Sequence, residues 1–386
     1  MSELRSRAML ARLIGFATVS RDSNLELIEF VRDYLHGLGV ACELIYNAER
    51  TKANLLATVG PSVAGGIVLS GHTDVVPVDG QAWTVEPFNL SEAGGKLYGR
   101  GTADMKGYLA SVLAAVPVFL ASPLKRPVHL AFSYDEEVGC LGVRGLLEVL
   151  PQRIPAPALC LIGEPTELKP VLGHKGKLAM RCHVRGAACH SAYAPYGVNA
   201  IEQAARLIGR LGDIGATLAR PSLHDKRFDP AFSTVQVGVI QGGTALNIVP
   251  ADCRFDFEIR ALPDFAPQVV VDELQDYAEQ TLLPAMQAVD SDTAIRFEKI
   301  SAYPGLATPA DSAAARLIAE LCGSDDFGTV AFGTEGGLFN QAGIATVVCG
   351  PGSMDQGHKP DEFVSVDQMA ACDRLMDRLA AYLSEQ

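Results

Sequence analysis

The amino-acid sequence predicts an α/β protein in which a mostly parallel sheet is flanked by helices and interrupted by a smaller α+β unit. Three observations predict this fold. Short apolar runs recur along the chain, and each ends in a polar cluster: IVLSGHTD (67–74), LAFSYDEE (130–137), ALCLIGEPT (158–166) and TVVCGPGS (346–353). Helical stretches separate these runs, and strands that alternate with helices indicate a parallel sheet. The middle of the chain instead shows strand-like alternation.

The N-terminal segment, MSELRSRAMLARLIGF, is predicted to be an amphipathic helix. Charges interrupt its apolar positions at helical spacing, whereas a signal peptide has a continuous apolar core. Further helices are expected over residues 105–120 and 143–150. No uncharged apolar run approaches the ~20 residues of a membrane span, so we expect no membrane partner.

The middle segments 178–186, 233–243 and 251–262 alternate polar and apolar residues, and the helical stretches 199–211 and 269–282 lie between or after them. Alternation with a period of two is typical of an antiparallel sheet that is buried on one face. We therefore expect an inserted unit over residues 176–302, and a first unit formed by residues 1–175 and 303–386.

The composition limits the function classes. The 386 residues are 48% hydrophobic, which is enough for at least one large core, and the length suggests two domains. The net charge of -13 argues against a nucleic-acid partner, because a phosphate backbone needs a basic surface. The nine cysteines are scattered without a CxxC pair, which favours reduced thiols in a cytoplasmic protein.

Polar residues at the predicted strand ends are the candidates for chemistry, since sites in such sheets form beyond the carboxyl ends of the strands. Two histidines and five acids fall there or at the start of a helix: His72, Asp74, Asp104, Glu136, Glu137, Glu164 and His358. Nitrogen and oxygen ligands of this kind suit zinc, cobalt or manganese. Two metal ions need a bridging carboxylate and terminal ligands for each ion. The set satisfies this requirement and leaves one carboxylate free.

The adjacent pair Glu136 and Glu137 supplies the carboxylate that binds no metal ion. Neighbouring residues at a strand end point in different directions, so one can bind metal while the other takes a proton from the attacking water. Each motif alone has an ordinary explanation: the HxD pair as a polar turn, the glutamates as a solvated loop, GEPT as a helix N-cap and His358 as a surface histidine. Their joint occurrence at strand ends favours a metal site.

The motifs resemble those of the M20 metallopeptidase family. SGHTDVVPVDG, GRGTADMKG, YDEEVGCLG, GEPT and the late GPGS…HKPDEF occur in the order of that family, and the inserted unit lies where the family has its lid and dimerisation domain. The resemblance implies a zinc-peptidase-like fold, a cis peptide after Asp104 and a homodimer. It also implies two divalent metal ions, zinc or cobalt.

The resemblance further implies a role for each residue. The metal ligands would be His72, Asp104, Glu137, Glu164 and His358. Asp104 would bridge the ions, with one histidine and one glutamate on each. Glu136 would be the general base, and Asp74 would orient the ring of His72.

The inserted unit carries further matches. His190, in RGAACHSAYAPYGVNAIE, resembles the histidine that stabilises the substrate oxyanion, often across a dimer interface. Asn247 and Arg260 match positions that hold the substrate, and Arg260 suits a bidentate grip on its α-carboxylate. Arg260 could equally form a structural ion pair and Asn247 cap a turn. Lys175 could be a hinge residue or a substrate contact.

Within the family, GEPT, GTEGGLF (333–339) and VVCGPGSMDQGHKPDEFV resemble the acetylornithine deacetylases most. This implies hydrolysis of a small N-acyl amino acid, N2-acetyl-L-ornithine, to ornithine and acetate. Glu335 is a candidate to attract the δ-ammonium of the ornithine chain. The alternative is that Glu335 is an ordinary surface acid on a loop. Gly336 departs from the Ala of many relatives. The alternatives are a succinyl-diaminopimelate desuccinylase, a broad aminoacylase, or a non-catalytic metal-binding scaffold, which would not need Glu136.

Overall fold

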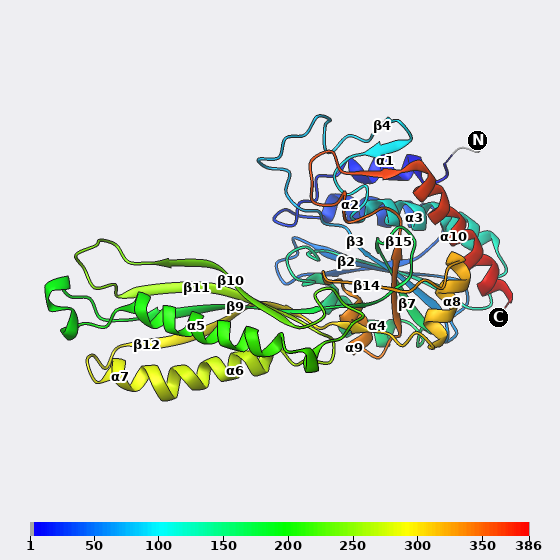
Figure 1. The fold of residues 1–386 in the computed structure, drawn as a ribbon. Helices are drawn as coiled ribbons and strands as arrows, with labels where there is room; N and C mark the ends of the chain where they lie inside the picture. Colours follow the sequence, from blue (N-terminus) through cyan, green and yellow to red (C-terminus); the bar gives the residue numbers. More distant parts are fainter. Residues whose placement is uncertain (1–3, 386) are drawn as a thin grey trace. The chain divides into compact units, whose positions relative to one another are not determined.

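The computed structural model describes residues 4–385, and the chain divides into two compact units (Figure 1). Unit 1 comprises the chain up to Gly173 together with Leu306–Thr329 and the chain from Thr334 onward. Unit 2 comprises His174–Gly305 and the short return segment Val330–Gly333. The sequence does not predict that return segment, because four residues carry no periodic pattern.

Unit 1 is built on a nine-stranded sheet that is parallel at its centre. The strands are β1 (Cys42–Tyr46), β2 (Ala53–Val59), β3 (Ile67–His72), β6 (Val128–Ser133), β7 (Leu159–Pro165), β8 (Val171–His174), β13 (Leu306–Ala307), β14 (Gly328–Val330) and β15 (Thr346–Gly350). Their order is β1-β2-β6-β3-β7-β15-β8-β13, and β14 pairs with β8. Strands β6, β3, β7 and β15 run parallel, whereas β1, β2 and β8 pair antiparallel. The predicted α/β class with a largely parallel sheet is confirmed.

Helices cover both faces of this sheet. They are α1 (Arg7–Ile14), α2 (Leu25–Gly37), α3 (Lys106–Ala121), α4 (Gly142–Arg153), α8 (Ala313–Cys322), α9 (Gly336–Gln341) and α10 (Val366–Glu385). In Figure 1, α1, α3 and α10 lie on one face and α4 and α9 on the other. A small sheet of β16 (Phe363–Ser365), β5 (Lys96–Tyr98) and β4 (Ser91–Ala93) completes the unit.

The central strands are apolar because they are buried on both faces. Every residue of β3, β6, β7 and β15 is buried, which is the pattern of a parallel strand covered on both sides. The amphipathic helix predicted within MSELRSRAMLARLIGF is confirmed as α1, which buries Leu10, Leu13 and Ile14, while residues 1–3 of that segment lie outside the described residues. The helices expected over 105–120 and 143–150 are α3 and α4.

Unit 2 is a four-stranded antiparallel sheet with helices packed against it. The strands are β9 (Gly176–Arg185), β10 (Thr234–Gly242), β11 (Asp252–Ala261) and β12 (Ala294–Tyr303), in the order β10-β11-β9-β12. The helices are α5 (Ala200–Leu218), α6 (Gln268–Tyr277) and α7 (Leu283–Gln287), with a π-helical turn at Ala278–Leu282 and 3-10 turns at Ser191–Tyr196 and Pro221–Leu223. The alternation predicted for this region is confirmed in β11, where every second residue is buried.

Two further findings concern the environment of the chain. Across residues 4–385, no helix combines the length and the apolar character that crossing a bilayer requires. The nine cysteines are all free thiols, and six of them are buried.

Candidate metal centre

The predicted strand-end residues meet in unit 1. His72 is the last residue of β3, Glu164 lies near the end of β7, and Glu137 follows β6. These strands are parallel neighbours with His72 in register with Ser133, so their carboxyl ends reach the same edge of the sheet. Asp104 precedes α3, and His358 lies between β15 and β16. The topology therefore gathers residues that are up to 286 positions apart, from 72 to 358.

Asp104 lies at the middle of the group. Its Oδ1 is 3.0 Å from Nε2 of His72, and its Oδ2 is 3.0 Å from Nε2 of His358. One carboxylate thus presents a different oxygen to each histidine, which is the arrangement of a ligand shared by two ions. The peptide bond between Asp104 and Met105 is cis, as the resemblance implied.

Each histidine also has a glutamate of its own. Oε1 of Glu164 is 3.7 Å from Nε2 of His72, and Oε2 of Glu137 is 3.1 Å from Nε2 of His358. Ligand atoms of His72, Asp104 and Glu137 all lie within 4.8 Å of one another, and so do those of His72, Glu136 and Glu164. The two sets of donors therefore overlap, because both include His72.

The acids of this group are buried and repel one another. Burial, together with the charge of Asp104, raises the pKa of Glu137 to about 7 and that of Glu164 well above its ordinary value. Burial also raises the pKa of Asp104, but hydrogen bonds from His358 and His72 outweigh it and leave that pKa low. Oε1 of Glu137 is buried and accepts no hydrogen bond from any described residue. Buried, partly unsatisfied oxygen and nitrogen donors fit divalent cations.

The histidine His72 is held from its other side. Its Nδ1 lies 2.8 Å from the backbone oxygen of Asp74 and 3.5 Å from the carboxylate of that residue. Burial lowers the pKa of His72, but hydrogen bonds to Asp104 and Asp74 and the charge of Glu164 raise it well above its ordinary value. The ring is therefore fixed chiefly by a backbone carbonyl, with the carboxylate beside it.

The carboxylate of Asp74 has further partners. It accepts hydrogen bonds from the hydroxyl of Ser20 at 2.6 Å, and from the backbone amides of Glu136 at 3.1 Å and Glu137 at 3.3 Å. Asp74 consequently ties the ring of His72 to the turn that carries both glutamates.

Only two of the three consecutive acids face the site. Asp135 has a left-handed backbone (φ 55°), and its carboxylate pairs with Nζ of Lys52 at 2.6 Å. Glu136 is the carboxylate without a histidine partner, and Sγ of Cys140 donates to its Oε1 at 3.4 Å. Burial first, with the charge of Glu137 and other acids added to it, raises the pKa of Glu136 well above its ordinary value.

Unit 2 holds the predicted oxyanion residue. His190 is exposed, and its Nδ1 accepts the backbone amide of Ala192 at 3.1 Å. Asn247 is also exposed, and its backbone oxygen accepts the amide of Ser191 at 3.0 Å. These two residues therefore lie close together within unit 2, since the His190 segment also bridges to Ile248.

Arg260 and Lys175 have partners within unit 2. Nε of Arg260 is 3.3 Å from Glu258, and its Nη1 donates to the hydroxyl of Tyr303 at 2.9 Å. The structural ion pair expected as an alternative role for Arg260 is therefore present. Nζ of Lys175 donates to the backbone oxygen of Phe232 at 2.7 Å.

Glu335 is not a surface acid, so that alternative is wrong. Its side chain is 1% exposed and accepts hydrogen bonds from the hydroxyls of Ser133 and, at 3.4 Å, Ser70. Burial raises its pKa to about 7. The pattern GTEGGLF did not reveal this position, because nothing in the loop sequence shows that Glu335 faces two buried serines on β3 and β6.

Sequence reasoning also missed residues that surround the ligands. Ser20 donates a hydrogen bond to Asp74, and Cys140 donates one to Glu136. Glu362 accepts hydrogen bonds from the loop that carries Asp104. Glu362 belongs to the HKPDEF motif, which the sequence already singles out. Its role was hidden because its partners are backbone amides, which no side-chain pattern reports.

Comparison with known proteins gives a family. Residues 68–382 match the model of the peptidase family M20/M25/M40. The acetylornithine deacetylase of Myxococcus xanthus is 36% identical over 383 residues, which is 97% of each chain. That of Proteus mirabilis is 37% identical over 364 residues, covering 92% of this chain and 89% of the relative.

Solved structures share the fold at lower sequence identity. The M20 family metallo-carboxypeptidase Sso-CP2 of Sulfolobus solfataricus superposes with a TM-score of 0.80 at 18% identity, over 100% of both chains. The YXEP protein of Bacillus subtilis, described as a dinuclear metal binding peptidase, has a TM-score of 0.67 at 15% identity over 99% of this chain and 98% of that one.

Proposed function

Because the chain belongs to the peptidase family M20/M25/M40 and is an amide hydrolase of that family, we propose that it hydrolyses N2-acetyl-L-ornithine to L-ornithine and acetate, a step of arginine biosynthesis. The shared name of relatives from four bacteria supports this substrate. Among the geometric observations, one carries the proposal. Asp104 presents one carboxylate oxygen to His72 and the other to His358.

The donor set supports two divalent ions, for which we propose zinc or cobalt. His72 and Glu164 would hold one ion, His358 and Glu137 the other, and Asp104 both. When bound, such ions polarise the substrate carbonyl and make water easier to deprotonate. They would also offset the mutual repulsion of the buried acids.

Glu136 is the proposed general base. Its carboxylate lies among the ligands but has no histidine partner, and Cys140 and the Asp74-bound turn hold it in place. It would take a proton from the attacking water and return that proton to the leaving amine nitrogen. The position of Glu136 beside His72 and Glu164, within 4.8 Å of their ligand atoms, supports this role.

His190 is the proposed donor to the developing oxyanion. Because its Nδ1 accepts the amide of Ala192, the neutral ring carries its proton on Nε2, which is then a donor. Asn247 would assist in holding the substrate, and Arg260 would grip the α-carboxylate with its fork of N–H groups. Unit 2 would accordingly act as a lid.

The homodimer is proposed together with this role for His190. If His190 acts on the site of a partner subunit, mixing inactive Glu136→Gln and His190→Gln variants restores part of the activity. If it acts within one chain, the mixture stays inactive, and the two outcomes assign the origin of the histidine.

Glu335 remains the proposed determinant of side-chain preference. Since its carboxylate is buried beneath Ser70 and Ser133, it would act on the substrate ammonium through its charge and not by direct contact. Comparing kcat/KM for acetylornithine and acetylmethionine in Glu335→Gln tests this. An unchanged ratio removes Glu335 from specificity.

A substrate panel tests the proposed function. Amine release is measured with and without added Zn²⁺ or Co²⁺ from acetylornithine, succinyl-diaminopimelate, acetylmethionine and a dipeptide. Metal-dependent turnover that is fastest for acetylornithine supports the proposal. Preference for succinyl-diaminopimelate or acetylmethionine would reassign the substrate, and no turnover by the metal-loaded protein would favour the scaffold.

We also propose a cytoplasmic location, which the nine free thiols support because reduced cysteines persist in that compartment. Fractionation of cells that express the chain tests it, and recovery outside the cytoplasm would contradict it.

A further inference from the structure

We propose that Glu362 is a positioning residue that holds the bridging carboxylate Asp104 and the histidine His358 in place for metal binding. The inference rests on the metal centre proposed above. Glu362 follows His358 by four positions and is 1% exposed.

One oxygen of Glu362 organises the loop that carries Asp104. Its Oε1 accepts three backbone amides: those of Gly101 at 3.1 Å, Ala103 at 2.9 Å and Asp104 itself at 3.1 Å. Three amides can point at one atom only if the chain curls around it, which fixes the backbone of the bridging residue. Hydrogen bonds to an ionised acceptor are also stronger than those to a neutral one.

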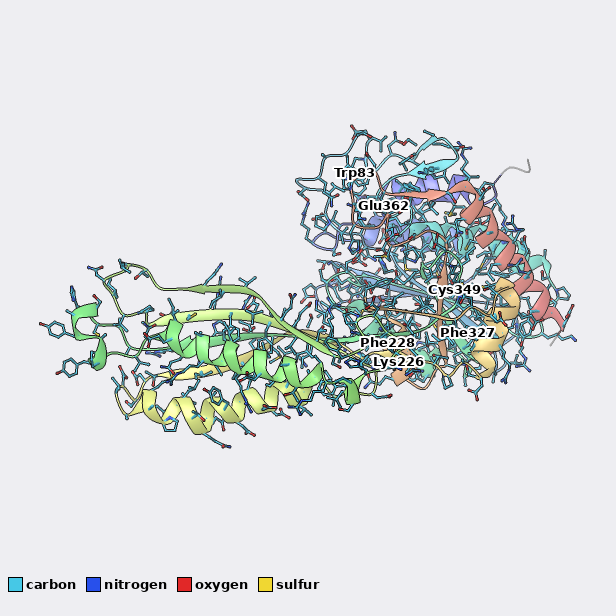
Figure 2. All side chains as sticks on the ribbon, in the orientation of Figure 1. Trp83, Lys226, Phe228, Phe327, Cys349 and Glu362 are labelled. Atoms are coloured by element: carbon cyan, nitrogen blue, oxygen red, sulfur yellow. The ribbon has the colours of Figure 1, made fainter. Side chains whose placement is uncertain are left out.

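The other oxygen of Glu362 joins this loop to Arg100. Its Oε2 is 2.6 Å from Nη1 of Arg100, and both side chains are 1% exposed. The guanidinium also lies 5.0 Å from the ring centre of Trp83. Figure 2 labels Trp83 and Glu362, which lie in the same part of unit 1. Removing Glu362 would leave a buried cation without its partner.

Arg100 carries the constraint to the segment of His358. Its Nη1 lies 3.4 Å from the backbone oxygen of Lys359, and its Nη2 donates to Oε1 of Gln81. Nε2 of Gln81 in turn donates to the backbone oxygen of His358 at 2.9 Å. His358 has a left-handed backbone (φ 60°), which is unfavourable for a residue with a Cβ and needs such support.

The two proposed metal positions should therefore respond differently. Glu362 holds the segments of two proposed ligands, Asp104 and His358. These two ligands bind the same ion only in the position that also includes Glu137. The other position keeps His72 and Glu164, which β3 and β7 hold independently of Glu362. Loss of Glu362 should weaken the His358 position more than the His72 position.

Calorimetric titration of metal-free protein with Zn²⁺ tests the inference. The binding step that disappears in His358→Ala identifies the His358 position. We expect Glu362→Ala to weaken that step at least ~10-fold, as loss of a residue that orients metal ligands typically does. Glu362→Gln keeps an oxygen for the three amides, so it should weaken the step less. The control Asp373→Ala removes another buried carboxylate, which accepts two hydrogen bonds from Ser6, and should leave both steps unchanged.

Each outcome decides between the two proposals. If wild-type protein shows no Zn²⁺ step that His358→Ala removes, the metal centre itself is wrong. If that step is present but Glu362→Ala leaves it within about threefold of wild type, Glu362 is merely structural and the inference is overturned. Should Glu362→Ala fail to fold by circular dichroism, Glu362→Gln decides, and an affinity equal to that of Asp373→Ala would overturn the inference.

Discussion

At the scale of single residues, the composition of the candidate metal centre depends on the directions in which the backbone points the side chains of three consecutive acids. Asp135 turns to Lys52, Glu137 to His358, and Glu136 remains without a histidine. The sequence predicts that the two glutamates point in different directions, and in the structure Glu137 is the one that forms an ion pair with a histidine. The sequence could not predict the partner of Asp135, because Lys52 is 83 positions away.

The separation of the two glutamates leads to a prediction. Glu136→Gln should lower kcat by ~10²–10⁴-fold, the usual contribution of a general base, while bound metal is retained. Glu137→Gln should instead lose metal. Activity and bound metal are measured together, with the exposed Glu148→Gln on α4 as a control that should behave like wild type. Retention of metal by Glu137→Gln and its loss by Glu136→Gln would mean that the two roles are exchanged.

The residues around the ligands were harder to predict than the ligands themselves. His72, Asp104 and Glu164 belong to recognisable strand-end motifs, whereas the carboxylates of Glu335 and Glu362 accept hydrogen bonds from a buried serine and from backbone amides. Such contacts depend on how distant segments pack. Sequence patterns therefore gave the candidate ligands but not the groups that hold them.

Among the elements, the end of β7 packs closely against α3. A Cβ built on Gly163, the residue before Glu164, would lie 2.0 Å from the ring of Tyr108 on α3. Glycine is therefore the residue that lets β7 approach α3 closely enough to present Glu164 beside His72.

This packing predicts that Gly163→Ala is destabilising. Inserting a methyl group into a filled core costs ~1–3 kcal/mol, and it should also displace Glu164 and weaken metal binding. Gly145 on α4 has no atom within 4 Å of a built Cβ, so Gly145→Ala should be neutral or stabilising. Urea unfolding followed by Trp83 fluorescence measures both variants, since Trp83 is the single tryptophan. Equal midpoints for the two variants would contradict the packing account.

Elements with strong periodicity were the predictable ones. The buried strands β3, β6, β7 and β15 and the alternating β11 were expected from sequence. The strand β12, AIRFEKISAY, was missed because charges occupy its solvent face and interrupt its short apolar positions. Its place in the sheet is decided by pairing with β9, which a local pattern does not show.

Across the whole molecule, stability should depend on a buried neutral histidine that is not part of the site. Nδ1 of His129 on β6 lies 2.9 Å from the hydroxyl of Thr58, and its Nε2 is buried without a partner among the described residues. Burial lowers its pKa to about 4. In the unfolded chain His129 therefore binds a proton as the pH falls through 6.5, whereas in the folded chain it does so only near pH 4.

The sign of this effect follows from linkage. The stability due to neutral His129 is present above pH 6.5 and is lost as the pH falls toward 4, by about 2 kcal/mol at pH 5. Urea unfolding of wild type and His129→Gln at pH 8 and pH 5, followed by Trp83 fluorescence, measures it. The loss of unfolding free energy between the two pH values should be smaller in the variant. An equal loss in both proteins would show that His129 is not the group responsible.

Anomalous diffraction from crystals grown with Zn²⁺ shows whether Asp104 joins two metal positions. We expect two zinc peaks, one contacted by His72 and Glu164 and the other by His358 and Glu137, with Asp104 contacting both. Zinc bound away from Asp104, or a single ion that leaves His358 and Glu137 without metal at saturating Zn²⁺, would contradict this expectation.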